Sequence, residues 1–262
     1  MPKFAANLSM LFTEMPFLER FAAARTAGFN AVECQTPYGF SAQDIAARLR
    51  DNGLSMVLHN LPPGNWDTGD RGIACDPARV AEFRDGVARG IEYAQRLNCT
   101  RINCLAGKLP QGVAPERARA TLVANLAFAA EQLEKIDARV LVEPINFYDV
   151  PGFFINRFEQ ALDVIAEAGG KNLQVQYDIY HAQRMQGELG NTLTQHLRHI
   201  GHIQIADNPG RHEPGTGEIN YPWLFDHIDA LGYDGWTGCE YLPLATTAEG
   251  LDWMRSLAQT GI

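Results

Sequence analysis

The chain has 262 residues, of which 46% are apolar and 20% are charged, which is the composition of a globular protein with a large buried core. Its formal net charge of −9 argues against a nucleic-acid-binding surface, because such binding depends on clustered lysine and arginine. The opening segment MPKFAANLSM lacks the apolar core of a signal peptide and no long apolar span follows it, so we expect a cytoplasmic protein with no membrane segment.

Eight short β-rich segments alternate along the chain with segments of helical period. The predicted strands are residues 4–8, 31–35, 55–60, 101–106, 139–143, 173–178, 202–206 and 236–241. Eight such strand–helix units predict a (β/α)8 TIM barrel in preference to an open doubly wound sheet. No GxGxxG motif follows the first strand, and no linker-like segment divides the chain. We therefore expect a single domain over residues 1–262.

Two of the predicted helices carry a clear apolar stripe. The helix over residues 115–135 has its proline near the start, and its stripe is Leu122, Leu126, Ala130 and Leu133. The helix after residue 157 ends at Gly169, and its stripe is Phe158, Ala161, Leu162, Ile165 and Ala166. A glycine directly after a helix is the usual C-cap of a helix-to-strand loop.

One connection is irregular. Residues 61–78, LPPGNWDTGDRGIACDPA, follow the third predicted strand and are rich in glycine, proline and aspartate. A long loop on a barrel can cover the active site, but an ordinary surface loop explains the composition equally well.

The five cysteines form no CxxC motif, and Cys34, Cys104 and Cys239 lie within predicted strands. This pattern is typical of reduced, mostly buried cysteines in a cytosolic protein.

The last four predicted strands each end at or close to a metal-competent oxygen. These residues are Glu143, Asp178, Gln204 and Glu240. The carboxyl ends of barrel strands meet at one face, and the polar parity of the sixth and seventh strands should point into the barrel mouth. Three converging carboxylates repel one another unless a cation is present, and an all-oxygen set suits Mg²⁺ or Mn²⁺. The alternative is a set of separate salt bridges at the strand ends.

Four segments of the sequence support a family resemblance. They are VEPIN, QYDIYH, HIQIADNPGRHEPGTGEINY and GCEY, and the likeness extends from FAANLSMLF to the C-terminal region. They resemble the xylose-isomerase-like barrel superfamily and, within it, the hydroxypyruvate isomerase family. The resemblance implies that Glu143 and Glu240 are metal ligands and also the proton donor and acceptor, and that Asp178 and Gln204 complete the metal site. Related ketose 3-epimerases usually have histidine where this chain has Gln204, and the change keeps an oxygen ligand.

The chemistry of such an isomerase suits these residue types. Moving a carbonyl between adjacent carbons requires the removal of a proton beside C=O and the return of one to the neighbouring carbon. A metal that holds both substrate oxygens stabilises the enediolate. Two carboxylates can then serve as general base and general acid, and the sequence leaves open which of them acts first.

Four further residues are candidates for the site. The resemblance implies that His181 contacts a substrate oxygen and that Arg211 binds substrate, for which its guanidinium could pair with a carboxylate. A structural histidine is the alternative for His181. Lys108 is a weaker candidate for the carboxylate, since an exposed loop lysine explains it better, and Glu33 is either a supporting acid near the site or half of a structural salt bridge.

Two motifs invite a functional interpretation that the spacing does not support. His196, His199 and His202 run from a helix end into a strand, so they cannot share one face, and a helix C-terminus favours histidine by its dipole. GTG at residues 215–217 lacks the Lys-Ser/Thr of a phosphate-binding loop, which leaves a tight turn.

Three classes of function follow. The first is a metal-dependent isomerase of hydroxypyruvate that forms tartronate semialdehyde, with the isomerisation of a four-carbon 2-oxo-tetronate by a sister family as its near alternative. The second is a nuclease of the endonuclease IV type, which the acidic charge and the scarcity of histidine ligands disfavour. The third is a non-catalytic sugar-acid binding protein. Barrels of this superfamily commonly associate, so a homo-oligomer is compatible with the sequence, which identifies neither the interface nor the native metal.

Overall fold

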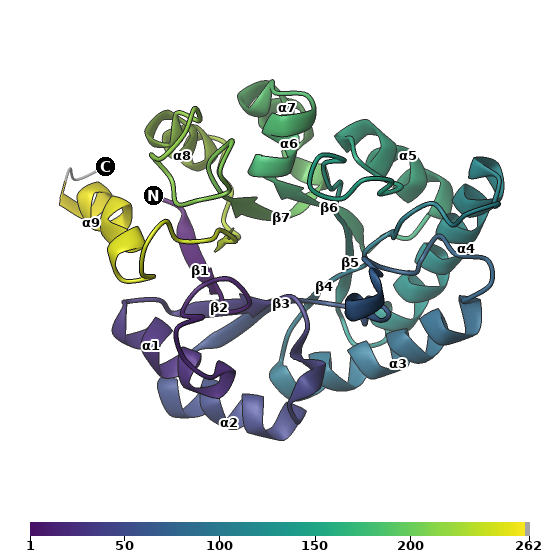
Figure 1. Cartoon of the computed structure of the whole chain (residues 1–262), viewed down its shortest axis with the longest axis horizontal. Helices are drawn as coiled ribbons and strands as arrows, with labels where there is room; N and C mark the ends of the chain where they lie inside the picture. The colour runs from purple at the N-terminus through teal and green to yellow at the C-terminus, as the bar shows by residue number, and fades with distance from the viewer. Residues whose placement is uncertain (260–262) are drawn as a thin grey trace.

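The computed structural model describes residues 1–259, with side chains described as far as Arg255. Eight parallel strands pair in chain order, and β1 pairs with β8 to close the barrel. Figure 1 shows the ring of strands with the helices outside it. The strands are β1 (Lys3–Asn7), β2 (Ala31–Cys34), β3 (Ser55–Asn60), β4 (Arg101–Asn103), β5 (Arg139–Val142), β6 (Leu173–Asp178), β7 (Ile200–Ile205) and β8 (Trp236–Cys239). The predicted (β/α)8 barrel is confirmed.

A helix follows every strand of the barrel. The helices are α1 (Arg20–Thr26), α2 (Ala42–Asn52), α3 (Val80–Leu97), α4 (Pro115–Glu134), α5 (Phe158–Ala168), α6 (Ile179–Met185), α7 (Leu189–His196), α8 (Tyr221–Ala230) and α9 (Asp252–Gln259). Short 3-10 turns are η1 (Phe17–Glu19), η2 (Pro37–Gly39), η3 (Trp66–Thr68), η4 (Leu197–His199) and η5 (Glu249–Leu251). Within residues 1–259, none of the helices combines the length and apolar character needed to cross a membrane.

The helices pack their apolar stripes against the barrel. In α4 the predicted stripe is buried as expected. In α5 the prediction for Ala166 is wrong: that residue is exposed, and Val164 is buried instead, because the buried side of this helix is centred on Phe158, Ala161 and Val164. Gly169 ends α5 in the left-handed region at φ 74°, as the sequence pattern predicts. All five cysteines are free and buried.

The barrel interior beneath its C-terminal mouth is polar. Glu33, on β2, lies within 2.6 Å of His202 Nε2 and accepts a hydrogen bond of 2.8 Å from Gln204 Nε2, and all three side chains are buried. Gly238 on β8 leaves room for this carboxylate, because a Cβ at that position would collide with it. Buried polar groups require such partners, and here the three side chains supply them for one another beneath the mouth.

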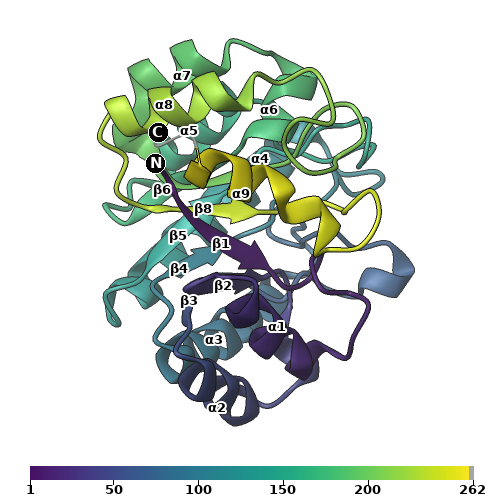
Figure 2. The ribbon, with the colours of Figure 1, turned by 90° about the vertical axis from the view of Figure 1, so that its left-hand side faces the viewer.

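The long connections lie at the C-terminal ends of the strands. Figure 2 shows β1 pointing toward the side from which the loops project. Residues 61–78 form one of these connections, between β3 and α3, and they contain η3. An antiparallel bridge between Gly72 and Ala106 holds this loop against the end of β4.

Candidate functional site

A cavity of about 200 Å³ opens at the C-terminal mouth of the barrel. Its lining comes from the ends of five strands, β2, β3, β4, β5 and β8, from helix α6, and from three loops. The lining residues are Gln35, Asn60, Trp66, Arg71, Leu105, Glu143, Ile145, Asp149, Val150, His181, Arg211 and Glu240. Four predicted site residues therefore share this cavity: Glu143, His181, Arg211 and Glu240.

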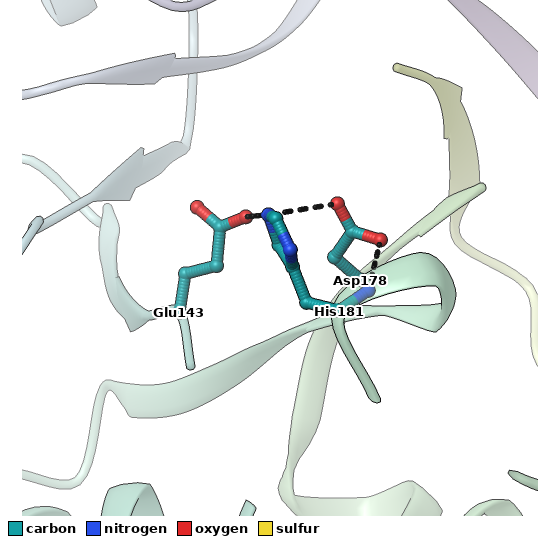
Figure 3. Close-up of side chains that lie close together, drawn as sticks. All are labelled: Glu143, Asp178 and His181. Carbon is teal, nitrogen blue, oxygen red and sulfur yellow. Dashed lines mark hydrogen bonds and ion pairs between the residues drawn. The ribbon is translucent and has the colours of Figure 1, made fainter. Parts of the chain in front are cut away.

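Glu143, Asp178 and His181 form a buried cluster in which one potential ligand atom of each lies within 4.8 Å of the others. His181 Nε2 is 3.8 Å from Glu143 Oε1 and 3.6 Å from Asp178 Oδ2. Figure 3 shows the imidazole between the two carboxylates. The other carboxylate oxygen of Asp178 caps α6 by accepting hydrogen bonds from the backbone N–H groups of Tyr180 and His181. The short strand-to-helix turn thus places the aspartate and the histidine side by side.

Glu240 lies beside Arg211. The Arg211 guanidinium donates to Glu240 Oε2 at 2.9 Å, and the same nitrogen is 3.8 Å from Asp178 Oδ2. The other oxygen of Glu240 accepts hydrogen bonds from Asn7 at 3.1 Å and Gln35 at 3.0 Å. The positive guanidinium is therefore shared between two acids of the predicted metal site.

Gln204 is buried next to this cluster, in register with Asp178 on the neighbouring strand. Its side-chain oxygen accepts a hydrogen bond of 2.6 Å from Gln176, and its nitrogen donates to Glu33. The oxygen that would bind a metal is thus engaged within the polar layer of the barrel, and ligation requires it to leave Gln176.

The hydrogen bonds around His181 assign its tautomer. Asn146 accepts a hydrogen bond from the backbone N–H of Asp149 through its side-chain oxygen, which orients its amide nitrogen toward His181 Nδ1 at 2.7 Å. His181 Nδ1 is then the acceptor of this shorter contact, so Nε2 carries the proton and faces the cluster, and the 3.5 Å approach of Arg211 Nη2 to Nε2 is not a hydrogen bond. In this tautomer Nε2 is a donor for a substrate oxygen, and metal binding by His181 would require the other tautomer.

Burial and mutual repulsion shift the protonation of these groups. Burial raises the pKa of Glu143 well above its usual range, and the nearby charges of Glu240 and Asp178 raise it further. Burial also raises the pKa of Asp178 to about 7, against the opposing effect of Arg211. Burial, with the charges of Arg211 and Arg184, lowers the pKa of His181 well below its usual range, so the imidazole is neutral.

The donor set fits a divalent cation. Asp178 Oδ2 is buried and has no hydrogen-bond partner among the described residues, so an acceptor atom faces the cluster unsatisfied. Carboxylate oxygens from Glu143, Asp178 and Glu240 suit a hard cation, whose charge would also offset their repulsion.

Several residues of the site were missed by the sequence analysis. Three of them lie at strand ends and donate hydrogen bonds to the two glutamates. Asn7 and Gln35 donate to Glu240, and Asn103 donates to Glu143 Oε2 at 2.8 Å. The rule applied to the last four strands, a polar side chain at the carboxyl end, would have found them on β1, β2 and β4. Trp66 and Arg71 had no such signal, because they lie within a loop.

Asp207 was also missed, although it organises the loop that carries Arg211. Its carboxylate accepts hydrogen bonds from the backbone N–H groups of Asn208, Gly215, Gly217 and Ile219. The GTG segment is therefore a tight loop around an internal carboxylate, in agreement with its predicted role as a turn.

The remaining candidates lie elsewhere. Lys108 is exposed and lines a neighbouring cavity of about 150 Å³, so the exposed loop lysine is the better description. His202 points into the barrel toward Glu33, whereas His196 and His199 lie before β7, as expected from their spacing.

Comparison with known proteins gives consistent results. The family model described as xylose isomerase-like TIM barrel matches residues 21–257. The chain is 54% identical to the hydroxypyruvate isomerase of Escherichia coli (strain K12), over 97% of this chain and 98% of that protein. It is 49% identical to a 2-oxo-tetronate isomerase of Cupriavidus necator, over 97% and 98%. A crystal structure from Brucella melitensis, titled AP endonuclease, family 2, is 42% identical with a TM-score of 0.95, covering 98% of this chain and 99% of that one.

Proposed function

Because the chain belongs to the xylose isomerase-like TIM barrel family and is one of its isomerases, we propose that it interconverts hydroxypyruvate and 2-hydroxy-3-oxopropanoate (tartronate semialdehyde). The higher identity to the relative named for hydroxypyruvate supports this substrate over the four-carbon acid. The reaction moves a carbonyl from C2 to C3 by way of an enediolate: one proton leaves C3, another is delivered to C2, and the hydroxyl proton of the C3 oxygen passes to the C2 oxygen.

The observation that carries the proposal is that Glu143 and Glu240 line one cavity with unequal surroundings. Glu240 receives hydrogen bonds from Asn7, Gln35 and Arg211. Glu143 receives one, from Asn103, and its raised pKa favours the protonated form. Two carboxyl groups that face one cavity, of which the one with the raised pKa has a single donor and the other has three, are suited to act as an acid and a base.

We assign the first proton transfer accordingly. Glu240 removes the proton from C3 of hydroxypyruvate, and Glu143 delivers a proton to C2. In the reverse direction the two exchange roles. His181, neutral and protonated at Nε2, donates a hydrogen bond to a substrate oxygen as negative charge develops on it.

Glu143, Asp178 and Glu240 would hold a divalent cation, Mg²⁺ or Mn²⁺, with Gln204 as a further ligand once its oxygen is released from Gln176. When bound, the cation supplies Lewis-acid stabilisation of the enediolate oxygens. Arg211, which donates to Glu240 and lies near Asp178, would be a second donor to a substrate oxygen while it stays paired with Glu240.

The test is proton NMR of hydroxypyruvate in D₂O with metal-stripped protein, followed by addition of Mg²⁺ or Mn²⁺. Tartronate semialdehyde that appears only with metal supports the proposal. If hydroxypyruvate is not converted with either metal but a four-carbon 2-oxo-tetronate is, the protein is a 2-oxo-tetronate isomerase instead.

Failure with both substrates would favour a non-catalytic sugar-acid binding protein. A nuclease finds less support, because the net charge is −9 and His181 is the only histidine in the acidic cluster found among the described residues. Release of product from an abasic-site duplex would nevertheless contradict the isomerase assignment.

A further inference from the structure

Arg71 is the second arginine that lines the site cavity, and it lies in the connection between β3 and α3. Arg211 enters from the connection after β7. In a closed barrel of eight strands, β3 and β7 are four strands apart, so the two arginines come from opposite sides of the mouth. Asp178 ends β6 and Glu240 follows β8, the two strands beside β7, whereas Glu143 follows β5, which is two strands from both β3 and β7.

Arg211 already has acidic partners, because it is paired with Glu240 and lies close to Asp178. Arg71 has no acidic partner: among the described residues it takes part in no ion pair within 4.0 Å. Its neighbour Asp70 is paired with Arg79 at 2.8 Å, and Asp149, the further acid of the cavity, is paired with Arg184 at 2.8 Å.

The Arg71 guanidinium is held in one orientation. Its Nη1 donates to the backbone carbonyls of Trp66 at 3.1 Å and Asp70 at 2.6 Å, and its central carbon lies 3.7 Å from the centroid of the Trp66 ring. Nε and Nη2 make no hydrogen bond with any described residue. The edge of a guanidinium formed by these two nitrogens can donate two parallel hydrogen bonds to one carboxylate.

The backbone keeps this side chain at the cavity. Gly72 adopts φ 104° and lies so close to the end of β4 that a Cβ there would collide with the Leu105 carbonyl. Leu105 itself lines the cavity, so the segment that carries Arg71 is pressed against the wall of the site. Glycine is required at this position for both the backbone angle and the close approach.

We propose that Arg71, and not Arg211, binds the carboxylate of the substrate. This inference rests on the proposed function and refines it: the substrate is an acid whose carboxylate lies against the Trp66–Arg71 loop, with its carbonyl and hydroxyl oxygens toward the acidic cluster. The opposite orientation would put the substrate carboxylate against Glu143 and Asp178. Residues 61–78 thus select for 2-oxo acids over neutral sugars of the same length.

The test compares an acid with its neutral counterpart. The Mn²⁺-loaded wild type, Arg71→Gln, Arg71→Lys and the exposed control Arg50→Gln are assayed with hydroxypyruvate and with dihydroxyacetone, in which CH₂OH replaces the carboxylate. For Arg71→Gln we expect kcat/KM for hydroxypyruvate to fall about 100-fold, mainly through KM, because a charge-assisted bidentate contact is lost. Dihydroxyacetone turnover should change less than about 3-fold. For Arg71→Lys, kcat/KM for hydroxypyruvate should lie between the wild-type and Arg71→Gln values, because lysine keeps the charge but cannot donate two parallel hydrogen bonds.

A binding measurement separates this inference from the proposed function. D-glycerate, which carries the carboxylate but has no carbonyl to isomerise, is titrated into the same Mn²⁺-loaded proteins by calorimetry. An affinity that falls about 100-fold in Arg71→Gln but not in Arg50→Gln supports the inference even if hydroxypyruvate is not turned over. Equal affinity in wild type and Arg71→Gln, or no binding of D-glycerate to the wild type, overturns it even if the isomerase activity is present.

Discussion

The side-chain amide of Asn146 donates a hydrogen bond to His181 Nδ1 over 2.7 Å, and this contact determines which imidazole nitrogen carries the proton. Asn146 is itself oriented by the backbone N–H of Asp149. The pair joins the segment after β5, which carries Glu143, to helix α6. As a result, the group that faces the acidic cluster is an N–H donor.

Replacing Asn146 by aspartate should reverse the tautomer, because a carboxylate can only accept from Nδ1. We expect kcat to fall about 100-fold, the lower range for loss of a positioned proton donor. Histidine ¹⁵N NMR of the metal-free variant should show the proton moved to Nδ1, or a charged imidazolium. The exposed Asn191→Asp is the matched control. Unchanged histidine shifts in Asn146→Asp would contradict the assignment.

The two glutamates should be distinguishable by isotope exchange. In Glu143→Gln we expect isomerisation to fall about 1000-fold, while exchange of the C3 protons of hydroxypyruvate with D₂O persists because the base Glu240 is intact. In Glu240→Gln both reactions should be lost. The measurement is proton NMR of the C3 signal over time, with circular dichroism as the check on folding. Exchange that survives in Glu240→Gln but not in Glu143→Gln would reverse the roles.

The metal-free protein should lose stability as the pH rises from 4 to 7. The pKa of Asp178 is about 7 in the folded state against an ordinary value of 3.8, so the folded protein retains a proton that the unfolded chain has released. For one such proton, the free energy of unfolding decreases by about 1.4 kcal/mol for each pH unit in this window and is constant above it.

Urea unfolding of the metal-free protein across this range tests the prediction, and Asp178→Asn should have a shallower dependence. Metal binding requires ionised carboxylates, so the increase in Tm on adding Mn²⁺ should be larger at pH 8 than at pH 5.5. An equal increase at both pH values would show that these acids are already ionised without metal.

Glu33 should be required for stability. Its side chain is fully buried and hydrogen-bonded to His202, Gln204 and Asn7, so Glu33→Ala removes three buried contacts and leaves the side-chain nitrogens of His202 and Gln204 that face it without a partner. We expect the free energy of unfolding to fall by about 3–5 kcal/mol. The exposed Glu92→Ala on α3 should change it by less than about 0.5 kcal/mol. Equilibrium urea denaturation at pH 7 is the measurement, and a loss in Glu33→Ala as small as that of the control would exclude a supporting role.

The sequence by itself determined the barrel and the acids at its mouth. Strand and helix periodicity are local properties of the chain, and a closed parallel barrel brings the carboxyl ends of its strands to one face, so Glu143, Asp178 and Glu240 could be placed before any contact was known. The glycine that ends α5 was predicted for the same reason, because a cap depends on adjacent residues.

Only the tertiary structure decided what these side chains do for one another. Asn7 and Glu240 are bonded although they are 233 positions apart, and Arg211 is paired with an acid on another strand. The engagement of Gln204 with Gln176 and the tautomer of His181 likewise depend on partners brought together by closure of the barrel. The charge, protonation and orientation of a buried group are set by its neighbours in space, and for these residues those neighbours are distant along the chain.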